Sequence, residues 1–296
     1  MRGTLSVRRL VPAMNGDEAF ALLNSPTLLT RNDVDTIVTE SEIGLRPDGE
    51  PLYVLIKDAL PYDLCAAAYP LTMSAANATI IGGIRAIAAG AYLEPRILKD
   101  GSQGRRNEIP FTPRLVGARN GMLGFFEKPK CHMTAFTANN WERFEEEVMP
   151  LARCVDEVFR QYLPARYAAQ AEAASLVEPR FVIAGTVFST ITTNRNWVTA
   201  VHTDSGDLRN GFGVQTLLTA GDFEGGGYAF PQYRVAIDAR MTDVLLADVH
   251  QPHGNLPIIG EMGQYERVSL IFYLREAMMR VCPAPRPFAQ GGTAAR

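Results

Sequence analysis

Two histidines and an aspartate in the C-terminal half of the chain have the types and the order of a metal-binding triad. His202 and Asp204 are separated by one residue, and His253 follows later in a turn-like segment, HGNLP. Two imidazoles and one carboxylate can occupy one face of an octahedral Fe(II) ion and leave three coordination positions open. This pattern therefore predicts an iron site that can also bind a co-substrate and dioxygen.

An arginine downstream of this triad suits an acidic co-substrate. Arg267 and Ser269 alternate in the strand-like run RVSLIFYL, so both side chains project from one face of the strand. A guanidinium pairs well with a carboxylate, and 2-oxoglutarate bound to iron through its keto-acid end would present its far carboxylate to Arg267. The combined pattern predicts an Fe(II)- and 2-oxoglutarate-dependent dioxygenase that uses O2 to oxidise a C–H bond.

His250 is an alternative to His253 as the third ligand, because only two residues separate them in HQPH. The position of His253 within the turn favours it, and His250 would then pack behind the site. His132 lies outside this cluster and suits a structural role. An HxD pair alone occurs by chance in many chains, so the prediction depends on its combination with the later histidine and arginine.

Composition and charge are those of an ordinary globular protein. The 296 residues are 47% hydrophobic and 21% charged, and the net charge of −3 excludes a global basic field for nucleic acid. We find no signal peptide and no membrane span, so we expect an intracellular protein. The cysteines lack CxxC spacing, so we expect a reducing compartment, no disulfide framework and no zinc site; they are Cys65, Cys131, Cys154 and Cys282.

The order of helical and strand patterns predicts an α+β fold. Residues 140–163 repeat apolar residues at three- and four-residue spacing, typical of an amphipathic helix that Pro150 would kink or divide. From residue 181 onward the chain changes to short runs rich in β-branched and aromatic residues, such as WVTAVH, GVQTLL and DVLLAD. Many short strands separated by turns predict a double-stranded β-helix, a cupin-like jelly roll, preceded by packing helices.

We expect residues 1–296 to form a single dioxygenase domain with three parts. Residues 1–95 are an N-terminal extension without an assigned role, 96–180 hold a basic loop and supporting helices, and 181–280 form the jelly-roll catalytic core. The basic stretch 96–119 suits phosphate binding and is equally typical of a solvated loop.

Several sequence stretches resemble the TET/JBP oxygenases, a family that hydroxylates the 5-methyl group of pyrimidines in DNA. The resemblance runs from about Arg114 to Glu276 and is closer to the J-binding-protein thymine-hydroxylase branch and its compact viral and microbial relatives than to the large animal enzymes. The stretches are GMLGFF with CHMTAFT, FSTITTNRNWVTAVHTDSGD, GFGVQTLL, GGGYAFPQYRVAID, DVLLADVHQPHGNLPI and ERVSLIFYLRE.

The resemblance implies roles for individual residues. It implies His202, Asp204 and His253 as iron ligands and Arg267 as the 2-oxoglutarate anchor, with Ser269 and Asn194 as further co-substrate contacts. Asp207 and Asn196 are candidate contacts to the target base. Ordering of the SGDL turn remains an alternative for Asp207, and structural capping remains one for both asparagines.

The resemblance also implies the substrate, DNA carrying a 5-methylpyrimidine. The expected reactions convert 5-methylcytosine to 5-hydroxymethylcytosine, with further oxidation left open, and thymine to 5-hydroxymethyluracil. A base can reach a barrel interior only when it is flipped out or single-stranded. A free nucleobase, a nucleotide or a protein side chain remains an alternative substrate, and a non-catalytic module that binds modified bases remains an alternative class. We expect no membrane or protein partner, and a phage-encoded enzyme acting in the host cytoplasm fits the compact relatives.

Overall fold

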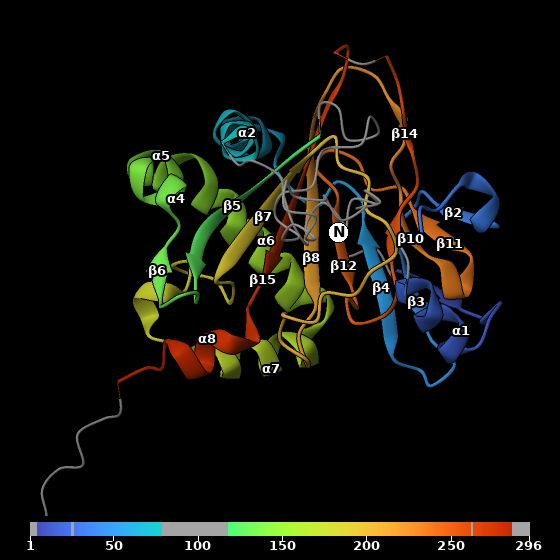
Figure 1. Ribbon diagram of the computed structural model, residues 1–296, viewed down its shortest axis with the longest axis horizontal. Coiled ribbons are helices and arrows are strands. Elements are labelled where there is room, and N and C mark those ends of the chain that lie inside the picture. Colours follow the sequence, from blue (N-terminus) through green and yellow to red (C-terminus); the bar gives the residue numbers. More distant parts are fainter. Residues whose placement is uncertain (1–4, 25–26, 79–117, 262, 286–296) are drawn as a thin grey trace, which may run out of the picture.

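The computed structural model describes residues 5–24, 27–78, 118–261 and 263–285, and within these ranges a large mixed sheet forms the centre of the molecule. Figure 1 shows its strands following one another from β5 across to β3. In spatial order the nine strands are β1 (Ser6–Arg9), β3 (Glu42–Leu45), β4 (Pro51–Ile56), β12 (Val244–Ala247), β8 (Gly213–Ala220), β15 (Glu266–Tyr273), β7 (Thr190–Arg195), β5 (Arg119–Phe126) and β6 (His132–Met133).

A smaller sheet packs against one face of the large sheet. Its four strands are β13 (Gly254–Asn255), β10 (Tyr228–Phe230), β11 (Val235–Ile237) and β2 (Thr36–Val38), and Figure 1 shows β10 and β11 beside β2. A separate pair joins β14 (Ile258–Ile259) to β9 (Glu224–Gly225). Phe230 and Ile237 of the small sheet share a buried cluster with Leu245 of β12, so apolar side chains fill the space between the sheets.

Helices cover the opposite face of the large sheet. The two longest are α2 (Tyr62–Asn77) and α6 (Met149–Tyr162). Along β15, Val268, Leu270 and Phe272 pack into the cluster formed with these helices. Because side chains alternate along a strand, Arg267 and Ser269 project to the other face, between the two sheets. On β15, this alternation places Arg267 and Ser269 between the sheets, beside the apolar cluster there, and the apolar side chains beneath the helices.

Shorter helices complete the described chain. They are α1 (Gly16–Ala21), α4 (Ala135–Asn139), α5 (Trp141–Arg143), α7 (Pro164–Ser175) and α8 (Glu276–Val281), with 3₁₀ turns η1 (Leu22–Asn24), η2 (Arg31–Asp33), η6 (Pro179–Phe181) and η7 (Pro231–Tyr233). None of the helices within the described ranges is long and apolar enough to cross a membrane.

The amphipathic segment predicted over 140–163 is confirmed, with a detail that the apolar pattern did not show. A π-helical segment, η5 (Phe144–Val148), joins α5 to α6, and Pro150 lies in the first turn of α6. Proline fits there because the N–H groups of a first helical turn need no partner within the helix. Phe144, Leu151 and Phe159 are fully buried, as the apolar stripe predicts.

The structure corrects two expectations from the sequence, and a third concerns residues that lie almost entirely outside the described ranges. Residues 36–56, within the extension left without a role, supply strands to both sheets, so the sheets reach beyond the expected 181–280. The run WVTAVH does not form a strand. The basic stretch 96–119 lies almost entirely outside the described residues.

Two cysteines form a disulfide, although the cysteine spacing predicted no disulfide framework and favoured a reducing compartment. Cys131 precedes β6 and Cys282 follows α8, and the two are bonded across a sequence separation of 151 residues. The spacing of the cysteines in the sequence does not predict this pair, because only the tertiary fold brings the two segments together. Cys65 and Cys154 are free thiols.

Candidate metal and co-substrate site

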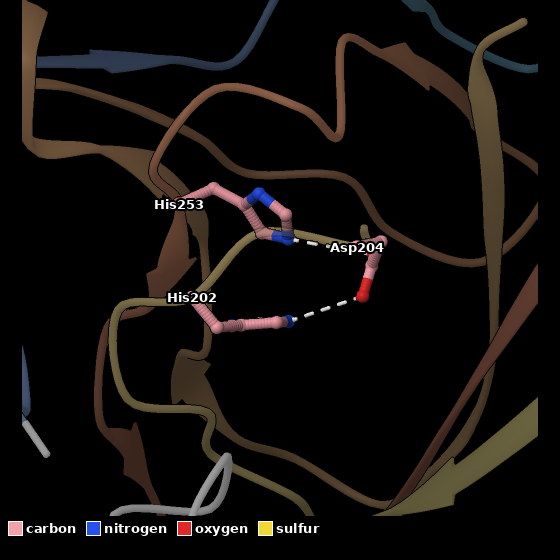
Figure 2. Close-up of side chains that lie close together, drawn as sticks. All are labelled: His202, Asp204 and His253. Atoms are coloured by element: carbon pink, nitrogen blue, oxygen red, sulfur yellow. Dashed lines mark ion pairs between the residues drawn. The ribbon is translucent and has the colours of Figure 1, made fainter. Parts of the chain in front are cut away.

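His202, Asp204 and His253 converge at one end of the space between the sheets. Their potential ligand atoms all lie within 4.8 Å of one another. Figure 2 shows the two imidazoles pointing at the same carboxylate, and each Nε2 lies 3.7 Å from an oxygen of Asp204. His250 is outside this group, since its Nε2 lies 3.1 Å from the carbonyl oxygen of Leu208. The structure thus brings together the favoured triad.

Backbone hydrogen bonds hold the two histidines opposite each other. The N–H of His202 donates to the carbonyl of His253 at 2.8 Å, and the N–H of His253 donates back at 3.0 Å. The N–H of Asp204 donates to the carbonyl of Val249 at 3.0 Å. A single antiparallel bridge, rather than the strand expected over WVTAVH, therefore positions the ligands.

Both imidazoles are oriented so that Nε2 is available to a metal. The Nδ1 atoms of His202 and His253 lie 2.8 Å from the carbonyl oxygens of Ala200 and Gln251. Donation from Nδ1–H to a carbonyl fixes the tautomer and leaves Nε2 with its lone pair. Burial, with the adjacent His202, lowers the pKa of His253 to about 3. His253 is therefore neutral near pH 7, the form that binds a metal.

This donor set fits Fe(II). Two neutral imidazoles and a carboxylate satisfy its ligand preference, and three ligands from one side leave the other positions open. Asp204 is the most accessible of the three, with 36% of its side chain exposed. The open side faces a cavity of about 470 Å³, a size typical of small-molecule sites.

Arg267 lies on the same strand as the cavity-lining Ser269 and has an unsatisfied hydrogen-bond donor, although it is not itself among the residues that line the cavity. The residue is 2% exposed, its Nη2 donates to the carbonyl of Gly226 at 2.9 Å, and its Nε has no partner among the described residues. Burial, together with nearby Arg240, lowers the pKa of Arg267 to about 10. A buried guanidinium with an unsatisfied donor is suited to a carboxylate, as the predicted 2-oxoglutarate anchor requires.

The backbone near Arg267 leaves room for its side chain. Gly226 has φ +70°, and a Cβ at this position would stand 3.1 Å from Nε of Arg267. Asn196, the predicted base contact, supports the strand here, because its Oδ1 accepts from the N–H of Arg267 at 2.9 Å and its Nδ2 donates to Glu266 at 3.2 Å. Asn196 is not among the residues that line the cavity, so its predicted substrate contact stays a prediction.

Ser269 and Asn194 face the cavity from neighbouring strands. They are direct partners across the antiparallel pair of β15 and β7. The Oδ1 of Asn194 accepts a hydrogen bond from the side chain of Asn120, which orients the amide. Both residues therefore line the same cavity as the metal triad, and their contact with a co-substrate stays a prediction.

Asp207 also lines the cavity, where a turn and an isolated bridge hold its backbone. Its N–H donates to the carbonyl of Asp204 at 3.1 Å, and its backbone forms a bridge with Arg275. Burial, and then the nearby Asp204 carboxylate, raises the pKa of Asp207 well above its usual value, against the opposing effect of Arg275. Asp207 can therefore order the turn through its backbone and still line the cavity, so neither of its two predicted roles excludes the other.

Two residues that line this cavity, Arg275 and Tyr228, were not predicted from the sequence. Arg275 lines the wall and forms a two-point ion pair with buried Glu127, at 2.6 and 3.0 Å. Tyr228 also lines the wall, and its ring stacks on His253 with a centroid distance of 4.9 Å. Burial, and then the carboxylates of Asp204 and two other aspartates, raises the pKa of Tyr228 well above its usual value, so the phenol is neutral. No local motif signals either contact.

Comparisons with known proteins agree with this geometry. Residues 121–276 match the family model Tet_JBP, described as the oxygenase domain of the 2OGFeDO superfamily. The bifunctional helicase and thymine dioxygenase JBP2 of Leishmania tarentolae is 34% identical over 206 residues, which cover 67% of this chain and 18% of that protein. The thymine dioxygenase JBP1 of Trypanosoma brucei brucei is 33% identical over 171 residues, 55% of this chain and 20% of the relative. The chain thus spans about a fifth of the length of these relatives.

A solved structure shows the fold. The chain of NgTET1 in complex with 5mC DNA matches with a TM-score of 0.57 at 10% identity, covering 90% of this chain and 93% of that chain. At this identity the match bears on architecture alone, and it confirms the predicted α+β class with a jelly-roll core.

Proposed function

This chain belongs to the Tet_JBP family of the 2OGFeDO superfamily, and we propose that it is an Fe(II)- and 2-oxoglutarate-dependent dioxygenase that hydroxylates the 5-methyl group of a pyrimidine in DNA. The convergence of His202, Asp204 and His253 on one point of an internal cavity carries the proposal, because it supplies the donor set that this chemistry needs. The relatives named as thymine dioxygenases support the substrate class.

The metal ligands and the co-substrate residues would have separate roles. His202, Asp204 and His253 would hold Fe(II), while Arg267 would bind the far carboxylate of 2-oxoglutarate with help from Ser269 and Asn194. When bound, iron and 2-oxoglutarate together use O2 to hydroxylate a C–H bond, forming succinate and CO2. The protein contributes the orientation of the co-substrate and a largely buried cavity.

The part of the cavity wall formed by Asp207 and Arg275 would receive the base. Asp207 and Arg275 are joined by a backbone bridge, and both line the cavity. Together they can accept a hydrogen bond from a ring or exocyclic N–H and donate one to a carbonyl or ring nitrogen, groups that thymine and 5-methylcytosine both carry. A base inside a duplex cannot reach this wall, so the target nucleotide would be flipped out or single-stranded.

Thymine is the substrate we favour, because both named relatives above carry that activity in their names. The test is anaerobic loading with Fe(II), then aerobic incubation with 2-oxoglutarate and two DNAs, one containing 5-methylcytosine and one containing only unmodified bases. Nucleoside mass spectrometry after digestion should show the gain of one oxygen atom on thymidine. A gain on 5-methyldeoxycytidine alone would change the substrate, and succinate release with no oxidised base would reject DNA as the target.

Single-stranded and duplex versions of the same DNA separate the two routes to the cavity. A base-flipping enzyme should oxidise both, with the duplex at a cost of a few kcal/mol for unstacking. Oxidation of the single strand only would restrict the enzyme to unpaired DNA.

A further inference from the structure

Tyr228 occupies a special position beside the metal triad. It lies on β10, and its ring is nearly parallel to the imidazole of His253, with an interplanar angle of 14°. The ring also packs against Phe230, with a centroid distance of 5.2 Å, and Phe230 in turn contacts His253 at 6.4 Å. The tyrosine therefore fixes one face of a proposed iron ligand.

The hydroxyl of Tyr228 is buried and has no hydrogen-bond partner among the described residues. The residue as a whole is 8% exposed, and it lines the cavity. Buried hydroxyl groups in folded proteins nearly always have a partner, because leaving one unsatisfied costs free energy. An unsatisfied donor in a cavity wall therefore indicates that its acceptor is an atom of a bound ligand.

Several of the neighbouring wall residues cannot supply that partner. Gly213, Ala247 and Val249 line the same cavity, and their side chains carry no hydrogen-bonding atom. The backbones of Gly213 and Ala247 are paired with each other across β8 and β12. The ring contact places Tyr228 beside His253, one of the proposed metal ligands, and the carboxylate of Asp204 is close enough to act on the phenol.

We propose that Tyr228 is a co-substrate-binding residue whose hydroxyl donates a hydrogen bond to an oxygen at the metal-binding end of 2-oxoglutarate. This inference rests on the proposed iron and 2-oxoglutarate site, but not on DNA as the substrate. A neutral phenol donates well to a carboxylate oxygen. The same ring holds His253 by stacking, so one residue contacts both a metal ligand and the molecule that binds the metal.

The experiment measures binding rather than turnover. The full chain is loaded with Mn(II) without oxygen, and isothermal titration calorimetry gives the Kd of 2-oxoglutarate for the parent protein and Tyr228→Phe. Removal of the hydroxyl alone should raise this Kd roughly tenfold, the size of one hydrogen bond to a charged group. The affinity for Mn(II), measured first, should not change, because phenylalanine keeps the stack. Tyr233→Phe, which removes a phenol outside the cavity, is the matched control.

Pyruvate identifies which end of the co-substrate is bound, because it has the keto-acid group and lacks the far carboxylate. Tyr228→Phe should weaken pyruvate by the same factor as 2-oxoglutarate, whereas Arg267→Ala should weaken 2-oxoglutarate alone. An unchanged Kd for 2-oxoglutarate, or a loss for 2-oxoglutarate without one for pyruvate, would overturn the assignment. Failure of the parent protein to bind 2-oxoglutarate would overturn this inference together with the proposed cofactor site. Absence of DNA oxidation with these binding shifts intact would reject only the proposed substrate.

Discussion

At the metal triad, backbone and Nδ1 hydrogen bonds hold the ligands, whereas two of the proposed co-substrate residues keep donors that have no partner among the described residues. His202 and His253 exchange two backbone bonds and each places Nδ1 beside a carbonyl. Arg267 and Tyr228, by contrast, each leave a buried donor unsatisfied. The fold by itself therefore satisfies the hydrogen bonds that hold the metal triad, whereas a ligand would satisfy those of Arg267 and Tyr228.

The two arrangements have different consequences for stability. A ligand side chain held by backbone bonds can be replaced with little effect on the fold, because the backbone bonds remain. An unsatisfied buried donor destabilises the empty protein and favours the bound state. Mutation and ligand addition should therefore act in opposite ways at the two places.

Asp204→Ala should abolish metal-dependent turnover and leave the fold intact. The carboxylate is the only anionic ligand in the triad, and 36% of its side chain is exposed, so its loss creates no buried cavity. Metal content and succinate release should fall to background while the Tm stays within a few degrees of the parent value. His250→Gln is the control and should retain iron and activity. Undiminished turnover of Asp204→Ala would remove this residue from the site.

Arg267→Ala should mainly raise the requirement for 2-oxoglutarate. Loss of a charge-assisted pair with the carboxylate costs about 2–3 kcal/mol, roughly a 30- to 150-fold increase in Kd. In the metal-free variant, removal of a buried charge with an unsatisfied Nε should offset part of the cost of the lost bond to Gly226 and of the cavity that alanine leaves. KM for 2-oxoglutarate and the Tm of the metal-free protein measure the two effects. An unchanged KM would place the anchor elsewhere, and exposed Arg180→Ala should change neither value.

Addition of 2-oxoglutarate should stabilise the Mn(II)-loaded protein beyond the effect of the metal. At about 100 times its Kd, a ligand adds about 2.7 kcal/mol of stability. For a domain somewhat smaller than this chain that corresponds to an increase in Tm of roughly 5–10 °C. Differential scanning calorimetry should show this step for the parent protein and a much smaller one for Arg267→Ala at the same concentration. Equal shifts in both would contradict the role of the arginine.

The sequence predicts the ligands of this site better than it predicts their supports. His202, Asp204 and Arg267 stand in short patterns whose chemistry can be recognised from residue type and spacing. The stack of Tyr228 on His253 and the Cys131–Cys282 bond join segments that are distant in sequence, and no local pattern records such contacts.

The same limit applies to the fold. The alternating pattern of β15 predicts its two faces correctly, and the apolar stripe predicts α6. β2 has only three residues, and β4 is a nearly continuous apolar run, so periodicity alone could not assign the strands of residues 36–56.

Glu127→Gln should give the smallest effect. It tests whether the ion pair that holds Arg275 in the cavity wall is independent of the metal ligands. Burial of Glu127 opposes its charge, but the hydrogen bonds from Arg275 outweigh this and leave the pKa of the carboxyl below its ordinary value of 4.5. A lowered carboxyl pKa gives stability that is present above the unfolded-state value and is lost as the pH falls through the folded-state value. Glutamine keeps one hydrogen bond to Arg275 and loses the charge, so the variant should lose about 1 kcal/mol near pH 7.

The difference between the two proteins should shrink as the pH is lowered below about 4.5, because the parent carboxyl then becomes protonated and resembles the amide. Urea unfolding at several pH values measures this change. Because Glu127 does not belong to the metal triad, the affinity for Mn(II) should be the same in both proteins, whereas KM for DNA should rise as Arg275 loses its fixed position. A pH-independent difference in stability would show that the charge of Glu127 does not contribute, and a parallel loss of metal affinity would show that the two regions are not independent.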